Sequence, residues 1–384
     1  MDQITTIDEL RKLAQKNVPK MFFDYLESGS WTENTLEANI NDLKKIKFRQ
    51  RVAVDISNRK ISKKMLGNNV TMPIAFAPTG LTGMQYVNGE ILAAQAAEEF
   101  GIPFTLSTMS ICSMEDVAEN TNNPFWFQLY VMKDLTFLKN LIKRAKAINC
   151  SALMITVDLQ IMGQRHKDIK NGLTSPPKIT FKNLLDFALR PKWCLRMLST
   201  RRRFFGNIVG HVDGISDTAK LSSWIDEQFD PKLSWDDIKR IKDWWGGKLI
   251  IKGILDPDDA ISASKCGADA IIISNHGGRQ LDDTVSTISM LPKIKSVLDD
   301  SVELWLDGGI RSGQDILKSI ALGADSTLVG RAFLYGLGAN GKEGVKKSLE
   351  IIRKELDLTM ALCGRNNINT VTSDILQKNY FDHQ

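Results

Sequence analysis

The chain has 384 residues, of which 43% are hydrophobic and 25% are charged. These fractions are typical of a folded globular protein with enough apolar material for a large core, and they exclude an intrinsically disordered chain. The formal net charge of +5 is mild for this length, so it favours anionic ligands or an anionic surface and does not indicate nucleic-acid binding.

The first 65 residues predict a helical extension. Thr6 and Glu9 have the spacing of a capping box at the start of one helix. Pro19 predicts the start of a second helix, with the sequence KMFFDYLESG, and Gly29 is placed to end it. The opening residues are polar and lack the apolar stretch of a secretory signal, so we expect no export.

Between residues 66 and 362 the pattern changes to short apolar runs separated by helical stretches. Buried parallel strands and their crossover helices produce this alternation. The eight runs begin at Met72, Pro103, Phe125, Ala152, Lys248, Asp269, Val302 and Asp325. Eight such units predict a single α/β domain, a parallel (β/α)8 TIM barrel, followed by a C-terminal tail over residues 363–384.

The fourth and fifth runs are separated by a segment far longer than a usual crossover, which predicts an insertion over residues 160–233. Within it, residues 176–205 interleave apolar side chains with eight basic ones. The basic residues are Lys178, Lys182, Arg190, Lys192, Arg196, Arg201, Arg202 and Arg203. This basic amphipathic pattern is typical of a segment that contacts a membrane surface. A solvated loop that covers the site would have the same sequence pattern and is the alternative.

Two other patterns limit the location and the chemistry. The five cysteines are scattered and form no CxxC pair, which argues against disulfides and structural zinc. We therefore expect no metal centre and a reducing, cytoplasmic location. No apolar run approaches the roughly 18 residues of a membrane-spanning helix.

Polar residues cluster where the predicted strands end, which is where ligands bind in this kind of barrel. The segment SNHGGRQLD places His276 and Arg279 three residues apart, among glycines that let a ligand approach the backbone. This context predicts a catalytic role for His276. By contrast, a single strand-end residue such as Ser107 or Thr156 could simply cap the next helix.

A phosphate site is predicted after the last two strands. Gly308 and Gly309 precede Arg311, and Gly330 precedes Arg331. Backbone N–H groups and a helix N-terminus often bind phosphate at these two positions of the barrel. Glycines alone could serve only tight turns, but two arginines at the same rim favour a phosphorylated cofactor or substrate.

Several motifs in order, APTG, LST, WFQLYV, TVD, IKGI, SNHGGRQLD, DGGIRSG and LVGRAFLYG, cover nearly the whole chain. With them the chain resembles the FMN-dependent L-2-hydroxy acid oxidases and dehydrogenases, the glycolate oxidase and L-lactate dehydrogenase family. The L-lactate and mandelate dehydrogenase branches are the most similar. The resemblance implies FMN as the cofactor.

The resemblance also implies roles for individual residues. His276 becomes the base that takes a proton from the substrate, and Asp158 holds the resulting imidazolium. The substrate's carboxylate and hydroxyl are assigned to Tyr25, Tyr130, Arg165 and Arg279. Lys252 is assigned to the N1 and O2 edge of the flavin. The remaining FMN contacts are Ala77, Pro78, Thr79, Ser107, Gln128, Thr156, Ser274, Asp307, Gly308, Gly309, Arg311, Gly330 and Arg331.

The function that follows from the resemblance is oxidation of a small L-2-hydroxy acid to the 2-keto acid. Gly80, Met109 and Met162 fall where the family varies its pocket wall and leave room beyond glycolate, so L-lactate, giving pyruvate, is the first expectation and a mandelate-like acid the second. If the basic segment 176–205 attaches the enzyme to the inner face of the cell membrane, we expect electrons to pass to a quinone. A soluble oxidase would instead pass them to oxygen. Relatives commonly form homotetramers.

Two alternative functions belong to other classes of enzyme. FMN barrels include isomerases of the type 2 isopentenyl diphosphate kind, but the pairing of His276 with Arg279 favours 2-hydroxy acids. The sequence GLGANG at residues 336–341 has the spacing of a dinucleotide-binding loop. It follows a helical pattern instead of a strand, which argues against a nicotinamide cofactor.

Overall fold

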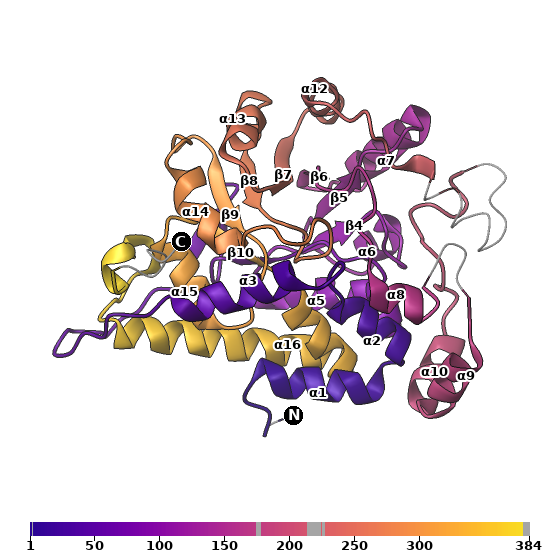
Figure 1. Ribbon diagram of the computed structural model, residues 1–384, viewed down its shortest axis with the longest axis horizontal. Coiled ribbons are helices and arrows are strands. Elements are labelled where there is room, and N and C mark those ends of the chain that lie inside the picture. Colours follow the sequence, from indigo (N-terminus) through magenta and orange to yellow (C-terminus); the bar gives the residue numbers. More distant parts are fainter. Residues whose placement is uncertain (2, 174–177, 213–223, 225–226, 379–384) are drawn as a thin grey trace.

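A (β/α)8 barrel forms the body of the protein, as predicted (Figure 1). The computed structural model describes residues 1, 3–173, 178–212, 224 and 227–378. The barrel strands are β3 (Ile74–Phe76), β4 (Thr105–Ser107), β5 (Trp126–Tyr130), β6 (Ala152–Thr156), β7 (Lys248–Ile254), β8 (Ala270–Ile273), β9 (Glu303–Leu306) and β10 (Ser326–Val329). They pair in parallel in the order β3-β10-β9-β8-β7-β6-β5-β4. A hydrogen bond of 2.9 Å from Phe76 N–H to the Pro103 carbonyl brings the two end strands together.

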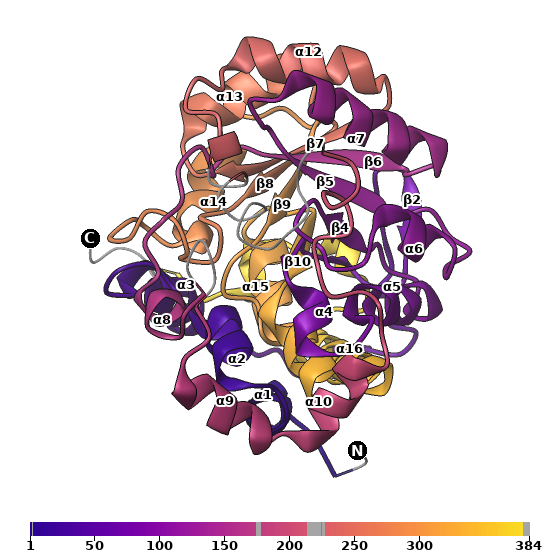
Figure 2. The ribbon, with the colours of Figure 1, turned by 90° about the vertical axis from the view of Figure 1, so that its right-hand side faces the viewer.

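Helices surround the strands, as Figures 1 and 2 show. The ring comprises α5 (Gly89–Phe100), α6 (Met114–Ala118), α7 (Leu135–Ala147), α12 (Trp235–Trp245), α13 (Pro257–Lys265), α14 (Thr287–Lys295), α15 (Gly313–Ala321) and α16 (Arg331–Leu362). The GLGANG sequence lies inside α16, where Asn340 and Gly341 leave helical geometry. No strand directly precedes it, so it does not open a dinucleotide-binding unit.

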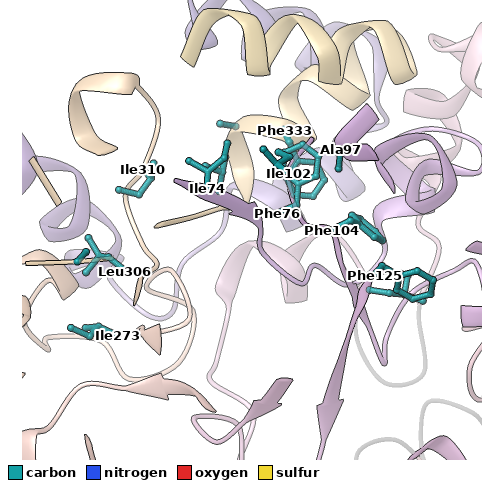
Figure 3. Close-up of a cluster of buried hydrophobic side chains, with 14 of the residues drawn as sticks. Ile74, Phe76, Ala97, Ile102, Phe104, Phe125, Ile273, Leu306, Ile310 and Phe333 are labelled. Carbon is teal, nitrogen blue, oxygen red and sulfur yellow. The ribbon is translucent and has the colours of Figure 1, made fainter. Parts of the chain in front are cut away.

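The core has two layers because the strands are apolar on both faces. Inside the barrel, Trp126 stacks on Trp305 with ring centroids 5.2 Å apart. Between the strands and the helices, Phe76 stacks on Phe333 of α16 at 4.3 Å, and Figure 3 shows these two rings beside Ile74. Burying one such side chain contributes roughly 1.5–3 kcal/mol. The strands read as continuous apolar runs in the sequence because both of their faces are buried.

The N-terminal extension contains α1 (Ile7–Asn17), α2 (Lys20–Glu27) and α3 (Asn34–Lys45). The Thr6–Glu9 capping box and the start of α2 after Pro19 are confirmed. The prediction that Gly29 ends α2 is wrong, because the helix ends at Glu27 and its cap, Ser28, is extended. Gly29 instead allows a close approach, since a Cβ there would lie 2.9 Å from the Gly278 carbonyl oxygen.

A short hairpin, β1 (Lys63–Met65) and β2 (Asn68–Val70), leads from the extension into the barrel. Met65 and Val70 pack with the residues that fill the barrel's interior. The Leu66 N–H donates to Glu303 at the start of β9. The hairpin thus covers the end of the barrel where the strands begin. In the C-terminal tail, η2 (Ser373–Ile375) contacts α15, and η1 (Ile368–Thr370) lies beside the extension, where the Ile368 N–H donates to the Lys60 carbonyl.

On the opposite side, where the strands end, short helices of the insertion lie within residues 160–173 and 178–212. They are α8 (His166–Lys170), α9 (Phe181–Ala188) and α10 (Pro191–Leu198). Helices α9 and α10 pack on each other and lie at the lower right edge of Figure 1. Helix α9 also contacts α2. Residues 176 and 177 of the predicted amphipathic segment and residues 213–223 and 225–226 of the insertion lie outside the described part of the chain.

None of the helices in the described ranges combines the length and the apolarity that a membrane span requires.

Candidate active site

A cavity of about 1130 Å³ opens at the carboxyl ends of the strands. Its wall is shared by the barrel, by α2 of the N-terminal extension and by the insertion. The predicted residues that line it are Tyr25, Ala77, Pro78, Thr79, Tyr130, Arg165, Lys252, His276, Arg279, Asp307, Gly330 and Arg331. Side chains from distant parts of the sequence therefore meet in one place, as the barrel topology requires.

His276 lies directly after β8 and is paired with Asp158, which follows β6. The distance from His276 Nδ1 to Asp158 Oδ1 is 2.8 Å. His276 has a φ of 57°, and Gly277 and Gly278 continue in the left-handed region. Such a conformation is uncommon for a side chain with a Cβ and typically marks a functional position. Asp158 can approach because residue 253 is glycine, where a Cβ would lie 2.7 Å from the Asp158 carboxyl carbon.

The environment keeps the imidazole of His276 neutral at pH 7. Burial lowers its pKa, and the nearby charges of Lys252 and Arg279 act in the same direction. Asp158 opposes this shift but does not outweigh it. A neutral imidazole whose Nδ1 faces a carboxylate leaves Nε2 as the proton acceptor. The pair thus has the form of a general base with a group that stabilises its charged form.

Lys252 is the centre of a second buried network. Its Nζ lies 2.9 Å from Asp307 Oδ2 and donates to Ser274 Oγ at 2.9 Å. Burial alone would lower the pKa of Lys252, but Asp307 and Asp158 outweigh that effect and raise it. Lys252 therefore presents a fixed positive charge to the cavity.

Arginines hold the end of α2 over the cavity. A helix leaves its last carbonyls without partners, and its C-terminus favours cations. Arg279 Nη1 donates to the carbonyls of Tyr25 and Ser28, and Arg331 donates to those of Leu26 and Ser28. These contacts fix the position of Tyr25, whose ring lies 4.6 Å from the Arg279 guanidinium.

The model of one protein family, described as FMN-dependent dehydrogenase, matches residues 14–378. The chain belongs to this family. It is 41% identical over 374 residues to an L-lactate dehydrogenase of Acinetobacter baumannii, covering 97% of each chain. It is 42% identical over 377 residues to an L-lactate dehydrogenase of Haemophilus influenzae, covering 97% of this chain and 98% of the relative. A solved structure of the monotopic membrane protein (S)-mandelate dehydrogenase matches with a TM-score of 0.93 at 34% identity, covering 98% of this chain and all of the other.

The cavity of this FMN-dependent dehydrogenase has polar atoms suited to a flavin ring. Gln128 Nε2 and Thr156 Oγ1 are buried and have no hydrogen-bond partner among the described residues. Buried polar groups normally find partners, so two orphans at adjacent strand ends indicate a polar ligand there. Gln128 is further oriented by the Ser107 hydroxyl, which donates to its Oε1 at 2.9 Å. These residues and Lys252 fit the carbonyl and nitrogen edge of an isoalloxazine.

The residues expected to bind the FMN phosphate make other contacts in this structure. Gly309 has a φ of 83° and packs against α3, where a Cβ would lie 2.2 Å from the Asn39 carbonyl oxygen. The Arg331 guanidinium is directed at the α2 and Gly277 carbonyls. Burial, with Arg311 and Arg279 nearby, lowers the pKa of Arg331 to about 10, so it keeps its charge at neutral pH. The N–H groups at Gly330 and at the start of α16 are further candidates for phosphate contact.

Tyr130 is positioned to remain a hydrogen-bond donor. It packs edge-on against Phe229 of the insertion, with ring centroids 6.2 Å apart. Burial raises the pKa of its phenol, with Tyr25 and Asp158 adding to the shift. The protonated hydroxyl can therefore donate to an oxygen of a bound substrate.

Sequence reasoning missed two residues of this site, Asp168 and Ser28. Asp168 Oδ2 lies 3.6 Å from Arg165 Nη1 and 3.9 Å from Arg279 Nη2, and the Ser28 hydroxyl donates to Asp168 Oδ1. Burial raises the pKa of Asp168, while both arginines act to lower it. The available signal was weak: an aspartate three residues after Arg165 in the short helix α8.

Proposed function

We propose that this FMN-dependent dehydrogenase oxidises L-lactate to pyruvate. The observation that carries the proposal is the shared cavity. It holds a neutral His276 paired with Asp158, two arginines around Tyr25, and the fixed charge of Lys252. A base, a carboxylate-binding pair and a flavin site are the groups that oxidation of a 2-hydroxy acid requires. Two similar relatives are named L-lactate dehydrogenases.

Each residue has a defined task in this reaction. Arg279 and Arg165 bind the carboxylate, because a guanidinium matches two oxygens at once. Tyr130 donates to the substrate's hydroxyl oxygen. His276 Nε2 takes the hydroxyl proton, and Asp158 stabilises the imidazolium that forms. When bound, FMN would accept the two electrons of the oxidation together with the second hydrogen, the one that leaves the substrate's Cα. Lys252 provides the positive charge that balances the negative charge gained by the flavin ring.

The proposal is tested by mixing the FMN-loaded protein anaerobically with L-lactate, L-mandelate and glycolate and following the loss of the oxidised flavin's visible absorbance. We expect L-lactate to reduce the flavin fastest, because Tyr25 and Met109 both lie close to Gly80 in the pocket wall. A Cβ at residue 80 would lie 3.2 Å from the Tyr25 hydroxyl. Faster reduction by L-mandelate would favour the function of the mandelate dehydrogenase neighbour, and faster reduction by glycolate would contradict both.

The pH profile provides a prediction that depends on His276. Because burial lowers its pKa below the ordinary 6.5, kcat/KM should be flat from pH 7 upward. It should fall about tenfold per pH unit once the imidazole is protonated. Replacing Asp158 by asparagine removes a carboxylate that raises this pKa. The acid limb should then move to lower pH while kcat falls, and a shift to higher pH would contradict the assignment.

We further propose that the protein attaches to a membrane surface through α9 and α10 and passes electrons to a quinone. These helices and their flanks carry exposed apolar side chains at Ile179, Phe181, Leu184, Leu185, Leu189, Leu195, Leu198 and Phe204. Exposed basic residues lie among them, including Lys182 and Lys192. Apolar contact together with attraction to anionic lipids is the usual basis of interfacial binding. The similarity to the structure of a monotopic membrane protein, (S)-mandelate dehydrogenase, supports attachment to a membrane surface.

Vesicle binding tests the attachment. Leu189 and Leu195 are 79% and 67% exposed, and replacing both by glutamate should abolish co-sedimentation with anionic vesicles. The control changes Leu358 and Leu362 of α16 to glutamate, which adds the same charge at exposed positions on another helix. We expect the control to bind as the unmodified protein does. Equal binding by both variants would contradict the proposal. The homotetramer expected from the family resemblance can be tested by sedimentation equilibrium.

A further inference from the structure

Three charged side chains form a compact cluster beside Tyr25. Asp168 lies on α8, Arg165 caps the start of that helix, and Arg279 follows β8. All three line the cavity, and their side chains are 9%, 12% and 13% exposed. The cluster therefore lies in a region where charge interactions are weakly screened by water.

Asp168 is not needed to hold Arg279 in place. Arg279 Nη1 already donates to two carbonyls and to the Ser28 hydroxyl at 2.5, 2.9 and 3.1 Å. The ion-pair distances from Asp168 to the two arginines, 3.6 and 3.9 Å, are longer than hydrogen bonds. Asp168 also accepts a hydrogen bond from the Ser28 hydroxyl, which an amide oxygen could accept equally well. What only a carboxylate at residue 168 adds is therefore its negative charge.

The net charge of the cluster matches one singly charged anionic group. Two guanidinium groups and one carboxylate give a net charge of +1, which a single substrate carboxylate neutralises. Without Asp168, the same two arginines would present a charge of +2, which suits a dianion. Charge matching of this kind in a buried site decides which ligand is accepted.

We propose that Asp168 is a specificity-determining residue that sets the net charge of the carboxylate pocket, so that the pocket accepts a monocarboxylate hydroxy acid and rejects a dicarboxylate. This inference rests on the proposed oxidation of L-2-hydroxy acids. It adds that the selection is made by a residue outside the predicted set of substrate contacts.

The test compares L-lactate with L-malate, an L-2-hydroxy acid that carries a second carboxylate. Asp168→Asn keeps the size of the side chain and an oxygen that can accept from Ser28, but removes the charge. We expect the ratio of kcat/KM for L-malate to that for L-lactate to rise about tenfold or more, because a charge a few ångströms from a buried anion is removed. The matched control is Asp300→Asn, the same change at a surface residue whose side chain is 95% exposed.

A binding measurement does not depend on turnover. Dissociation constants for malonate, a dianion, and pyruvate, a monoanion, can be read from the change in flavin absorbance. Asp168→Asn should strengthen malonate binding relative to pyruvate by about tenfold or more. If L-lactate fails to reduce the flavin of the unmodified protein, the proposed function fails, but this ratio still tests the role of Asp168.

A second variant guards against misfolding of the first. Arg165→Gln lowers the cluster's charge to zero and should shift both ratios in the opposite direction, toward the monoanion. Combining Arg165→Gln with Asp168→Asn restores +1 and should bring the ratios back toward those of the unmodified protein. The proposal would be overturned if the malate-to-lactate and malonate-to-pyruvate ratios stayed within about twofold of the original in these variants. Equal losses of affinity for the monoanion and the dianion would overturn it too, and Asp168 would then be a structural residue.

Discussion

Replacing His276 by glutamine is expected to lower kcat/KM for L-lactate by about 10²- to 10⁴-fold, the range that a positioned general base contributes. Glutamine fills similar space and can still accept a hydrogen bond, but it cannot hold the proton taken from the substrate's hydroxyl. In the proposed reaction that proton goes to an imidazole that burial keeps neutral and that lies 2.8 Å from Asp158. Stopped-flow measurement of anaerobic flavin reduction gives the rate of this step directly.

The effect should be chemical and not structural. His276→Gln should retain FMN, and its dissociation constant for pyruvate should change little because the arginines are untouched. His211→Gln makes the same replacement at an exposed residue that does not line the cavity, and it should reduce its flavin at the native rate. Flavin reduction in His276→Gln within threefold of native would remove His276 from the role of base.

The barrel could be predicted from sequence because its strands are buried on both faces. Runs such as the one from Ala270 to Ile273 are apolar at every position, so the eight strands stand out from the helices between them. The strand ends then place the polar residues of the site in one region without further information, since all parallel strands end on the same side. This topology also explains how His276 and Asp158 meet although 118 positions separate them.

The parts that sequence did not reveal depend on contacts between the barrel and its additions. Gly29 looks like a helix end, yet it allows a neighbouring backbone segment to pack closely. Nothing near Arg331 in the sequence indicates that its guanidinium also binds carbonyls at the end of α2. Asp168 gives no local signal, because its importance arises from two arginines brought to it by folding. Such pairings are long-range and leave no periodicity in the chain.

The N-terminal extension is consequently part of the site. Arg279 and Arg331 bind the unpaired carbonyls of α2, and the Ser30 N–H donates to the Gly278 carbonyl in the loop that carries His276. Helix α2, the loop that carries His276 and the arginines proposed to bind the carboxylate therefore share one set of hydrogen bonds. A change that loosens α2 should affect substrate binding through Tyr25 and Arg279, although α2 lies outside the barrel.

Replacing Lys252 by methionine should slow flavin reduction by about 10²- to 10³-fold, the loss seen when one group that stabilises developing charge is removed. Methionine preserves much of the side chain's length and apolar stem but leaves Asp307 and Ser274 without their cation. The uncompensated Asp307 then lies near the ring that must gain negative charge. The reduction potential of the bound FMN should therefore fall together with the rate.

Lys318→Met is the matched control, because Lys318 is also a buried lysine but donates to the Leu43 carbonyl on the outer side of the barrel. It should lower thermal stability without altering the flavin's potential or its rate of reduction. The two measurements separate stability from chemistry, since Lys252 lines the cavity and Lys318 does not. If Lys252→Met kept the native potential while losing rate, the lysine would be acting on substrate position, and the charge-balancing role assigned to it would be wrong.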